Sequence, residues 1–232
     1  MENTQTNDEK KKQVIPPVGS VRFGDLHRLE PLTRSFGYER GQPIDRYYIE
    51  KFLKQYEKDI SGQVIEIGDD RYTRMFGTGV TRSDVLDQAH PDSNPTIIAD
   101  LAHADHVLSD SFDCVIITQT LQFIYDVHAA VNTLYRILKP GGVVLGSLPS
   151  LSPICRYDMD RWGDYWRFTS AAVRKLFIEC FEPDNIHVDS HGNVLVAMAF
   201  LQGMSADDMT TQELDYKDQD YEVLITIRAA KK

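Results

Sequence analysis

The sequence predicts an α/β protein with a largely parallel sheet that is covered by helices on both faces. Two observations lead to this prediction. Short apolar runs rich in β-branched residues alternate along the chain with longer segments in which apolar residues recur at helical spacing. Strands that alternate with helices form parallel sheets, because each crossover helix returns the chain to the same edge of the sheet.

The expected elements follow this alternation from residue 43 to residue 228. The apolar runs predicted to be strands span residues 64–67, 80–85, 96–99, 113–118, 143–148, 186–190 and 223–227. Helical periodicity begins near Pro43 and recurs over residues 71–76, over 127–138, after the expected helix cap Thr169, and over 193–203. The segment Lys139-Pro140-Gly141-Gly142 is expected to break the helix that precedes it.

The chain divides into three parts by composition. Residues 1–13 are polar and charged, which is typical of a disordered tail, and they lack the apolar core of a secretory signal. Residues 14–60 combine many turn-forming residues with a helix and are expected to form an arm that acts as a lid. Residues 61–232 contain the alternating strands and helices and are expected to form the main domain.

Composition also limits the partners and the compartment. The 232 residues carry a formal net charge of −10, whereas nucleic-acid binding depends on lysine and arginine contacts to phosphates, so DNA and RNA are disfavoured as partners. No run approaches the roughly 18–20 apolar residues that a membrane helix needs, so no membrane partner is expected. The three cysteines lack CxxC spacing and predict neither a disulfide framework nor a zinc site. A reducing, cytoplasmic location is the simplest interpretation.

Polar residues lie at or directly after the ends of the first four predicted strands, at the edge where parallel α/β sheets bind ligands. Gly68 allows a ligand to approach the backbone closely. Asp84, 18 residues after Glu66, is expected to end the second strand and to accept hydrogen bonds from two ribose hydroxyls; Asp87, close behind it, and Glu66 are the alternatives. Asp100 can accept from an exocyclic amine such as that of adenine. The residues expected around this ligand are Glu66, Gly68, Asp69, Asp84, Asp100, Leu101, Thr118 and Gln119.

These motifs, taken in order, resemble the class I S-adenosylmethionine-dependent methyltransferases of the type-11 kind. The resemblance covers residues 62 to about 150, and its most specific part is Arg136-Ile137-Leu138-Lys139-Pro140-Gly141-Gly142 before a strand. It implies a Rossmann-like, seven-stranded, mostly parallel sheet whose last strand is antiparallel. It also implies S-adenosyl-L-methionine as the cofactor, with residues 61–232 as the methyltransferase domain.

The loop after the first strand departs from the family pattern, which usually continues with two more glycines. Here those positions hold Asp70 and Tyr72, so side chains such as Arg71 or Tyr72 are expected to contact the cofactor. The same departure disfavours a nicotinamide cofactor, whose site requires Gly-x-Gly-x-x-Gly. In the arm, Arg46 or Tyr47 is a candidate to bind the methionine carboxylate; a solvated helix face is the alternative interpretation.

The acceptor is expected to contact an aromatic run, residues 156–169, between the fifth strand and the next helix; this segment is called the acceptor run. Both tryptophans of the chain lie in this run among arginines and aspartates, a combination that suits a sugar or another polyhydroxylated ring. Its portion Tyr165-Trp166-Arg167-Phe168-Thr169 resembles methyltransferases found with glycan- and sugar-modifying enzymes. The alternative is that the aromatic residues pack the loop onto the sheet. The candidate substrate-binding residues are Tyr157, Trp162, Tyr165, Trp166 and Arg167.

A hydroxyl acceptor needs a general base, because its proton must leave during methyl transfer. Asp158, Asp160 and Asp164 lie in the acceptor run, and His191 follows the sixth predicted strand. A histidine has a suitable pKa for this role near neutral pH. The same aspartates could instead hold a divalent metal with the substrate, but no ligand spacing predicts a transition-metal site.

Three functions are consistent with these residues. The leading hypothesis is O-methylation of a saccharide or a small hydroxylated metabolite. The alternatives are N-methylation of an amino sugar or small amine, and a non-catalytic domain that binds the cofactor or a partner protein. The expected partner is therefore a small-molecule or saccharide acceptor, and the sequence leaves a homodimer open.

Overall fold

The structure, a computed structural model, describes residues 15–88 and 94–232. The predicted disordered tail, residues 1–13, lies outside the described residues. The sheet has seven strands in the order β3-β2-β1-β4-β5-β7-β6. Their bounds are β1 Gly62–Ile67, β2 Val80–Asp87, β3 Ile97–Ile98, β4 Phe112–Thr118, β5 Leu138–Pro149, β6 Ile186–His191 and β7 Leu224–Ala230.

Strand direction agrees with the prediction. The pairs β2–β3, β1–β2, β1–β4 and β4–β5 are parallel, whereas β7 runs antiparallel to both of its neighbours, β5 and β6. The sheet is therefore mostly parallel with an antiparallel last strand, as the resemblance implied. Several strands extend beyond the expected bounds. Among them, β2 continues two residues past Val85, and β5 begins at Leu138, directly after a helix.

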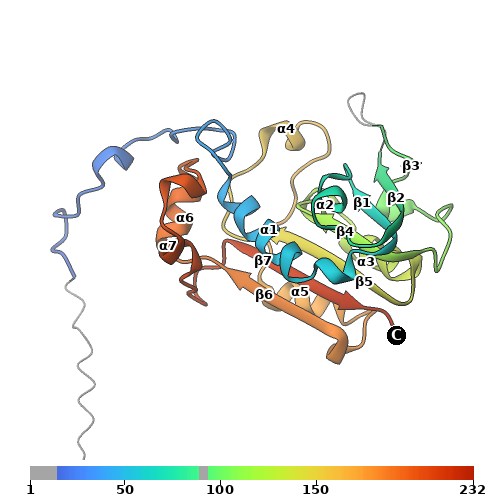
Figure 1. The fold of residues 1–232 in the computed structure, drawn as a ribbon. Helices are drawn as coiled ribbons and strands as arrows, with labels where there is room; N and C mark the ends of the chain where they lie inside the picture. The colour runs from blue at the N-terminus through green and yellow to red at the C-terminus, as the bar shows by residue number, and fades with distance from the viewer. Residues whose placement is uncertain (1–14, 89–93) are drawn as a thin grey trace, which may run out of the picture.

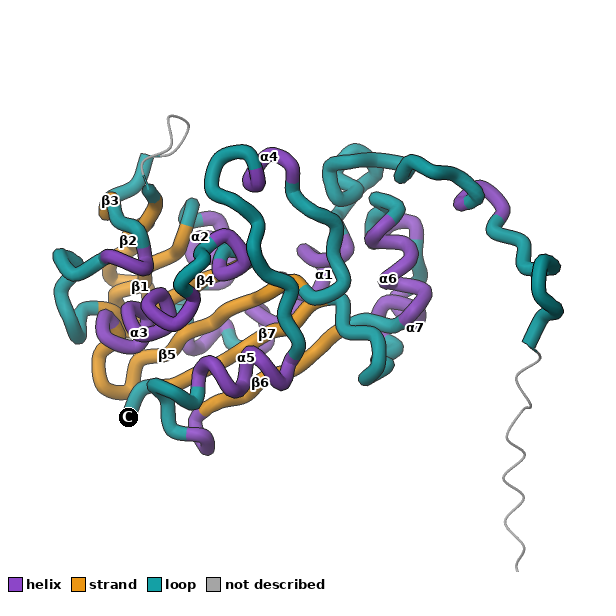
Figure 2. The backbone as a smooth tube through the Cα atoms, turned by 180° about the vertical axis from the view of Figure 1, so that it is seen from behind, coloured by secondary structure: helices purple, strands orange, loops and turns teal. Residues whose placement is uncertain are grey.

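Seven α-helices of the described chain surround this sheet. Their bounds are α1 Ile44–Gln55, α2 Arg71–Phe76, α3 Val127–Ile137, α4 Arg156–Met159, α5 Ser170–Phe177, α6 Val194–Leu201 and α7 Thr211–Asp215. Helix α1 lies on one face of the sheet, which is turned toward the viewer in Figure 1. Helices α3 and α5 lie on the other face, which Figure 2 shows from behind.

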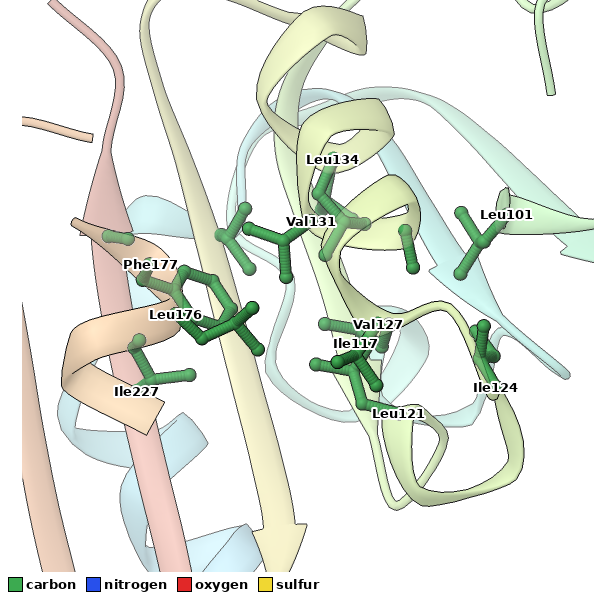
Figure 3. Packing of buried hydrophobic residues seen from close by; sticks show 14 of the residues in the cluster. Leu101, Ile117, Leu121, Ile124, Val127, Val131, Leu134, Leu176, Phe177 and Ile227 are labelled. Atoms are coloured by element: carbon green, nitrogen blue, oxygen red, sulfur yellow. The ribbon is translucent and has the colours of Figure 1, made fainter. Parts of the chain in front are cut away.

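The two faces of the sheet are covered by separate apolar clusters because strand residues alternate between the faces. Ile65, Val115 and Ile117 belong to the cluster on the α3 and α5 side. Their neighbours in sequence, such as Val64 and Ile116, belong to the cluster with α1 and α6. Figure 3 shows the first cluster, in which residues of α3 and α5 pack against β4 and β7. These two clusters, one on each face of the sheet, form the hydrophobic core.

Side chains cap the beginnings of α3 and α5. Thr169 caps α5 as predicted, because its hydroxyl accepts a hydrogen bond of 3.2 Å from the Ala172 amide. Asp126 caps α3 in the same way through the Ala129 amide. Such caps satisfy amide groups that the first helical turn leaves unpaired. The cap at Thr169 fixes where the acceptor run ends.

The described part of the arm leads from residue 15 to α1 and projects from the main body at its beginning (Figure 1). It first contacts the body at α6, where the Leu32 amide donates to the Gln202 carbonyl over 2.7 Å. Phe36 then packs on Phe200 of α6, with ring centroids 6.0 Å apart. Within the described residues, no helix has the length and apolarity required to span a membrane.

Candidate functional site

A cavity of about 570 Å³ opens at the carboxyl ends of the parallel strands. Each of the first four strands contributes residues from the loop that follows it, as expected for a ligand site in such a sheet. These residues are Gly68 and Asp69 after β1, Asp87 and Gln88 at and after the end of β2, Ala99 and Leu101 after β3, and Thr118, Gln119 and Thr120 at and after the end of β4. The structure therefore brings together six of the eight residues predicted at these strand ends, the sixth being Glu66.

Glu66 anchors the loop that forms the floor of this cavity. Its carboxylate accepts hydrogen bonds from the amides of Tyr72 and Thr73 and from the Thr73 hydroxyl, at 3.0, 2.7 and 2.8 Å. The side chain is buried, and burial raises its pKa to about 7 despite these donors. Glu66 thereby holds the start of α2 against the end of β1.

Gly68 lies in the turn that Glu66 anchors and has a φ of +93°. This left-handed conformation disfavours side chains. A Cβ atom built at this position meets no protein atom within 4 Å, so the space beside it is open. The bare backbone at Gly68 can consequently approach a ligand in the cavity.

The prediction that Asp84 ends the second strand is wrong. The strand continues to Asp87, so Asp84 lies inside it and is buried. Its carboxylate is bound by Arg82 at 2.7 Å and by the Thr96 hydroxyl at 2.9 Å, away from the cavity. Asp87 is the carboxylate of this strand that lines the cavity.

Asp100 follows β3 as predicted, but its side chain does not line the cavity. One carboxylate oxygen caps the next helical turn by accepting from the Ala102 amide at 2.9 Å. The other oxygen lies 3.1 Å from His103 Nδ1. The neighbours Ala99 and Leu101 line the cavity instead and give this part of it an apolar wall.

Helix α1 contributes one of the two residues predicted there. Arg46 lines the cavity, and its Nε donates to the Tyr38 hydroxyl over 3.1 Å. Burial opposes the charge of Arg46, but the Asp45 carboxylate together with the hydroxyls of Tyr72 and Tyr38 outweighs this effect and raises the pKa of Arg46. Tyr47 points elsewhere, because consecutive helical residues are rotated by about 100°. Its hydroxyl binds Asp215, so the expectation that Tyr47 faces the cofactor is not supported.

The departure from the glycine pattern places two side chains on the cavity wall. Both Arg71 and Tyr72 line it, as predicted. Arg71 forms an ion pair of 3.1 Å with Glu50 of α1, and its guanidinium lies 5.5 Å from the Tyr72 ring centroid. Side chains therefore connect this loop to α1.

A second cavity of about 100 Å³ adjoins the first. Five residues line both, so the two cavities are direct neighbours. These shared residues are Tyr38, Arg46, Gln119, Phe123 and Asp158. Gln119 has a φ of +49°, in the left-handed region that non-glycine residues rarely adopt and that is found most often at functional sites.

The four candidate bases occupy different environments. Asp158, on α4, lines both cavities. Asp164 lines the second cavity, but Arg167 pairs with both of its oxygens at 2.6 and 2.9 Å. Asp160 lines neither cavity and pairs with Arg156 on the surface. The position of Asp158 is therefore the most suitable for a base.

His191 does not lie near these cavities, in contrast to the prediction. It ends β6, which is the edge strand beyond β7, and stacks on Tyr48 with ring centroids 5.2 Å apart. Its Nε2 lies 3.0 Å from the Thr226 hydroxyl, and burial lowers its pKa. The strand end was predicted correctly, but β7 and the edge position separate it from the site.

The aromatic run is divided between the site and the core. Tyr157 and Trp162 line the first cavity. Trp166 packs against the core, and its Nε1 donates to the Ile124 carbonyl at 3.1 Å. Tyr165 packs edge-on against Tyr125 and donates its hydroxyl to the Trp162 carbonyl. The packing interpretation thus fits Trp166, whereas Tyr165 is about half exposed and packs on the neighbouring loop. Arg167 lines the second cavity while it is paired with Asp164.

Several lining residues were not predicted, among them Tyr38, Gln122 and Phe123. Asp87 was the alternative to Asp84, and Leu86 extends the apolar alternation of its strand. No periodic signal marks the others, which lie in the arm and in the 3₁₀ helix Leu121–Phe123. Over residues 15–88 and 94–232, no cluster of three or more histidine, cysteine or acidic side chains is arranged to hold a metal ion.

Comparisons with known proteins agree with this geometry. Residues 59–146 match the type-11 family described as a methyltransferase domain. Among solved structures, the chain is similar to an S-adenosylmethionine-dependent methyltransferase from Mesorhizobium loti, with 18% identity, a TM-score of 0.53, and coverage of 81% of this chain and 98% of that one. A sequence comparison with curated proteins finds no match.

Two further solved structures share the fold. The N-methyltransferase NodS from Bradyrhizobium japonicum WM9, in complex with S-adenosyl-L-homocysteine, has 12% identity and a TM-score of 0.52 over 89% of this chain and 94% of that one. A SAM-dependent methyltransferase from Archaeoglobus fulgidus has 11% identity and a TM-score of 0.53 over 80% and 94%. The predicted Rossmann-like methyltransferase fold and S-adenosylmethionine-dependent domain are confirmed, whereas the expected glycan association gains no support.

Proposed function

Starting from a methyltransferase domain of the S-adenosylmethionine-dependent type, we propose that this chain transfers a methyl group from the cofactor in the first cavity to a small-molecule acceptor in the second. The observation that carries the proposal is that the two cavities adjoin and share lining residues, Asp158 and Gln119 among them. A cofactor in the first cavity and an acceptor in the second would meet beside these shared residues, which form the junction of the two cavities.

The lining of the first cavity suits each part of the cofactor. The Gly68 backbone allows close approach, and the Asp87 carboxylate can accept from both ribose hydroxyls. Ala99 and Leu101 offer an apolar wall for the adenine ring. Arg46, held charged beside Asp45, suits the methionine carboxylate, because guanidinium groups bind carboxylates with paired hydrogen bonds.

Methyl transfer is an in-line displacement in which the acceptor atom attacks the methyl carbon as the bond to sulfur breaks. Holding the two reactants in that alignment supplies much of the rate. Asp158, at the junction, is the residue that we assign to receive the proton from the acceptor. Asp160, Asp164 and His191 are not assigned this role, because they are distant from the junction or already paired.

The chemical class of the acceptor stays as the sequence suggested it. A saccharide hydroxyl is the leading hypothesis, and Tyr157 and Trp162 lie near the acceptor cavity, since they line the first cavity together with Asp158, which also lines the second. An amine acceptor is the second candidate, because the carboxylates of Asp45, Asp158 and Asp164 line the second cavity. Cytoplasmic location and a homodimer stay predictions.

Calorimetric titration with S-adenosylmethionine tests the cofactor site, with two aspartates of one strand as a matched pair. Asp87→Asn should weaken binding about ten- to a hundredfold, because hydrogen bonds to a charged acceptor contribute about 1.5–3 kcal/mol. Asp84→Asn should leave the affinity unchanged, because Asp84 points to Arg82 and Thr96. Absence of binding at millimolar cofactor would refute the proposal. Binding without any methyl transfer would favour the non-catalytic alternative.

A further inference from the structure

Helix α6 is apolar on all of its sides. None of the residues from Val194 to Leu201 has a polar side chain. Its inner positions are buried in the core cluster that contains Val196 and Phe200. Its outer positions are each 38–47% exposed and form the outer face of α6, which consists of Val194, Leu195, Met198 and Leu201. Helices that are apolar all round are normally buried on every side, so this outer face is suited to a partner.

The outward positions of two longer helices are polar, in contrast to α6. The exposed positions of α1 are Lys51, Lys54 and Gln55, and those of α3 are His128 and Asn132. Such faces are typical of helices that cover a sheet and meet water on the other side. The apolar outer face is therefore a property of α6 and does not follow from the layered architecture.

The beginning of the arm also exposes apolar side chains. Residues 15–30 are exposed except for Leu26, which is half-buried. In both views this part of the chain leads away from the body (Figures 1 and 2). Residues 15–31 are called the arm segment. Its large apolar side chains are 52–107% exposed and belong to Ile15, Val18, Val21, Phe23 and Leu29.

The arm segment and the outer face of α6 lie next to each other in the fold. Directly after the arm segment, the Leu32 amide donates to the carbonyl of Gln202, the residue that ends α6. The Thr33 hydroxyl donates to the Gly203 carbonyl over 2.9 Å. From this anchor the arm segment leads away from its own body, so both apolar surfaces stay exposed in a single chain.

Charge favours contact between an arm and a body over contact between two bodies. Residues 1–34 carry six basic and five acidic residues, whereas the rest of the chain carries 19 basic and 30 acidic ones. Residues 205–222, which follow α6 and include the neighbouring helix α7, hold seven acidic residues and one lysine. Two acidic bodies repel each other, whereas the arm brings a small net positive charge.

The size of the two surfaces suits a dimer. The arm segment and the outer face of α6 together provide about 20 residues from each copy, as in a specific interface of standard size. Each copy carries one arm and one outer face. A two-fold pair therefore covers both faces and leaves neither an arm nor a face over.

From these observations we infer that this chain forms a homodimer in which the arm segment of each copy packs on the outer face of α6 of its partner. The inference goes beyond the proposed function and does not depend on it. It has a consequence for the site, because the arm continues to Phe36 and Tyr38, which line the second cavity. The partner would then hold the segment that leads into the acceptor cavity.

Light scattering after size-exclusion chromatography of the full chain tests the inference. At about 50 μM, where a micromolar dissociation constant leaves dimers dominant, the wild type should have twice the 26.5 kDa mass of one chain. A face variant, Leu195→Gln with Met198→Gln, should raise the dissociation constant at least tenfold. An arm variant, Val18→Gln with Leu29→Gln, should do the same.

The control variant is Ile178→Gln, which replaces a side chain of similar exposure at the end of α5, on the opposite side of the sheet. It should leave the dimer unchanged. Circular dichroism shows whether each variant folds. If the face variant does not fold, the arm variant still tests the interface, because both of its substitutions lie at exposed positions of the arm.

Mixing the face variant with the arm variant, each with a different affinity tag, shows which chain the arm covers. In the mixed dimer the intact arm of one copy meets the intact face of the other, so one complete contact returns. The two tags should therefore purify together, although each variant alone is monomeric. An arm that packs on α6 of its own chain predicts no such recovery.

Several results would overturn the inference. These are a wild-type mass of 26.5 kDa at about 50 μM, a dimer that is equally stable in all variants, and a mixture in which the tags stay separate. Monomeric wild type that sediments with phosphatidylcholine vesicles, when the face variant does not, would assign the face to a lipid surface instead. Titration with S-adenosylmethionine tests the proposed function separately, and its outcome does not affect the dimer.

Discussion

Replacing Glu66 by glutamine tests how the cofactor loop is held. Glu66 accepts three hydrogen bonds from Tyr72 and Thr73 and is buried between β1 and α2. Glutamine keeps the size of the side chain and one acceptor oxygen, which can serve both Thr73 donors. The Tyr72 amide would then face an NH₂ group, and leaving that amide unpaired should cost about 1–3 kcal/mol of folding free energy near pH 5.

The cost of this substitution depends on pH, because burial raises the pKa of Glu66 from 4.5 to about 7. The folded protein therefore holds this proton more tightly than the unfolded chain. As the pH rises above 4.5, the unfolded chain releases the proton first, and stability falls until the folded protein releases it near pH 7. A pKa difference of about 2.5 corresponds to a loss of about 3 kcal/mol over this window.

Urea denaturation of the wild type and Glu66→Gln at several pH values between 4.5 and 8 measures this effect. The wild type should lose about 3 kcal/mol more than the variant across the window, because glutamine does not titrate. Groups common to both proteins cancel in the difference. Parallel stability profiles for the two proteins would refute the reasoning, and so would a wild type that gains stability relative to the variant.

Two further substitutions test the cavity and the core. Gly68→Ala should weaken S-adenosylmethionine binding at least tenfold in calorimetry, because the new methyl group would enter the open space beside the turn; its strain at φ +93° should cost only about 1–2 kcal/mol of stability. Unchanged affinity would show that the cofactor does not approach this backbone. Leu134→Ala, in the fully buried face of α3, should cost about 2–5 kcal/mol in urea denaturation, whereas Leu29→Ala, in the exposed arm, should cost less than about 0.5 kcal/mol. Equal losses would contradict the assignment of the core.

Most of the fold could be predicted, because strand and helix periodicity depends on local sequence. The runs at residues 64–67 and 113–118 are strands with nearly the expected bounds, and Thr169 caps a helix. The boundary of β2 was misplaced because the apolar run was ended at Val85. The strand continues to Asp87, so Asp87 and not Asp84 is the carboxylate at the strand end that lines the cavity.

The acceptor side was less predictable, because its composition does not reveal which contacts form. Trp162 and Trp166 are four residues apart in one aromatic run. Trp162 lines the cavity, whereas Trp166 reaches the Ile124 carbonyl, a partner 42 residues away in sequence. No pattern in the sequence marked Gln122 as a lining residue. Its hydrogen bond to Gln119, which in turn donates to Asp45, forms only in the tertiary structure.

The place of β7 in the sheet has a consequence for how the chain folds during synthesis. β7 is the last strand along the described chain, yet it lies between β5 and β6 and supplies the only strand neighbour of β6 among the described residues. Until residues 224–230 leave the ribosome, β5 has one unpaired edge and β6 has no partner. Such edges are prone to wrong pairing. A nascent chain stalled before residue 224 should therefore be a substrate for chaperones and proteases, although most of its cavity residues have already been made.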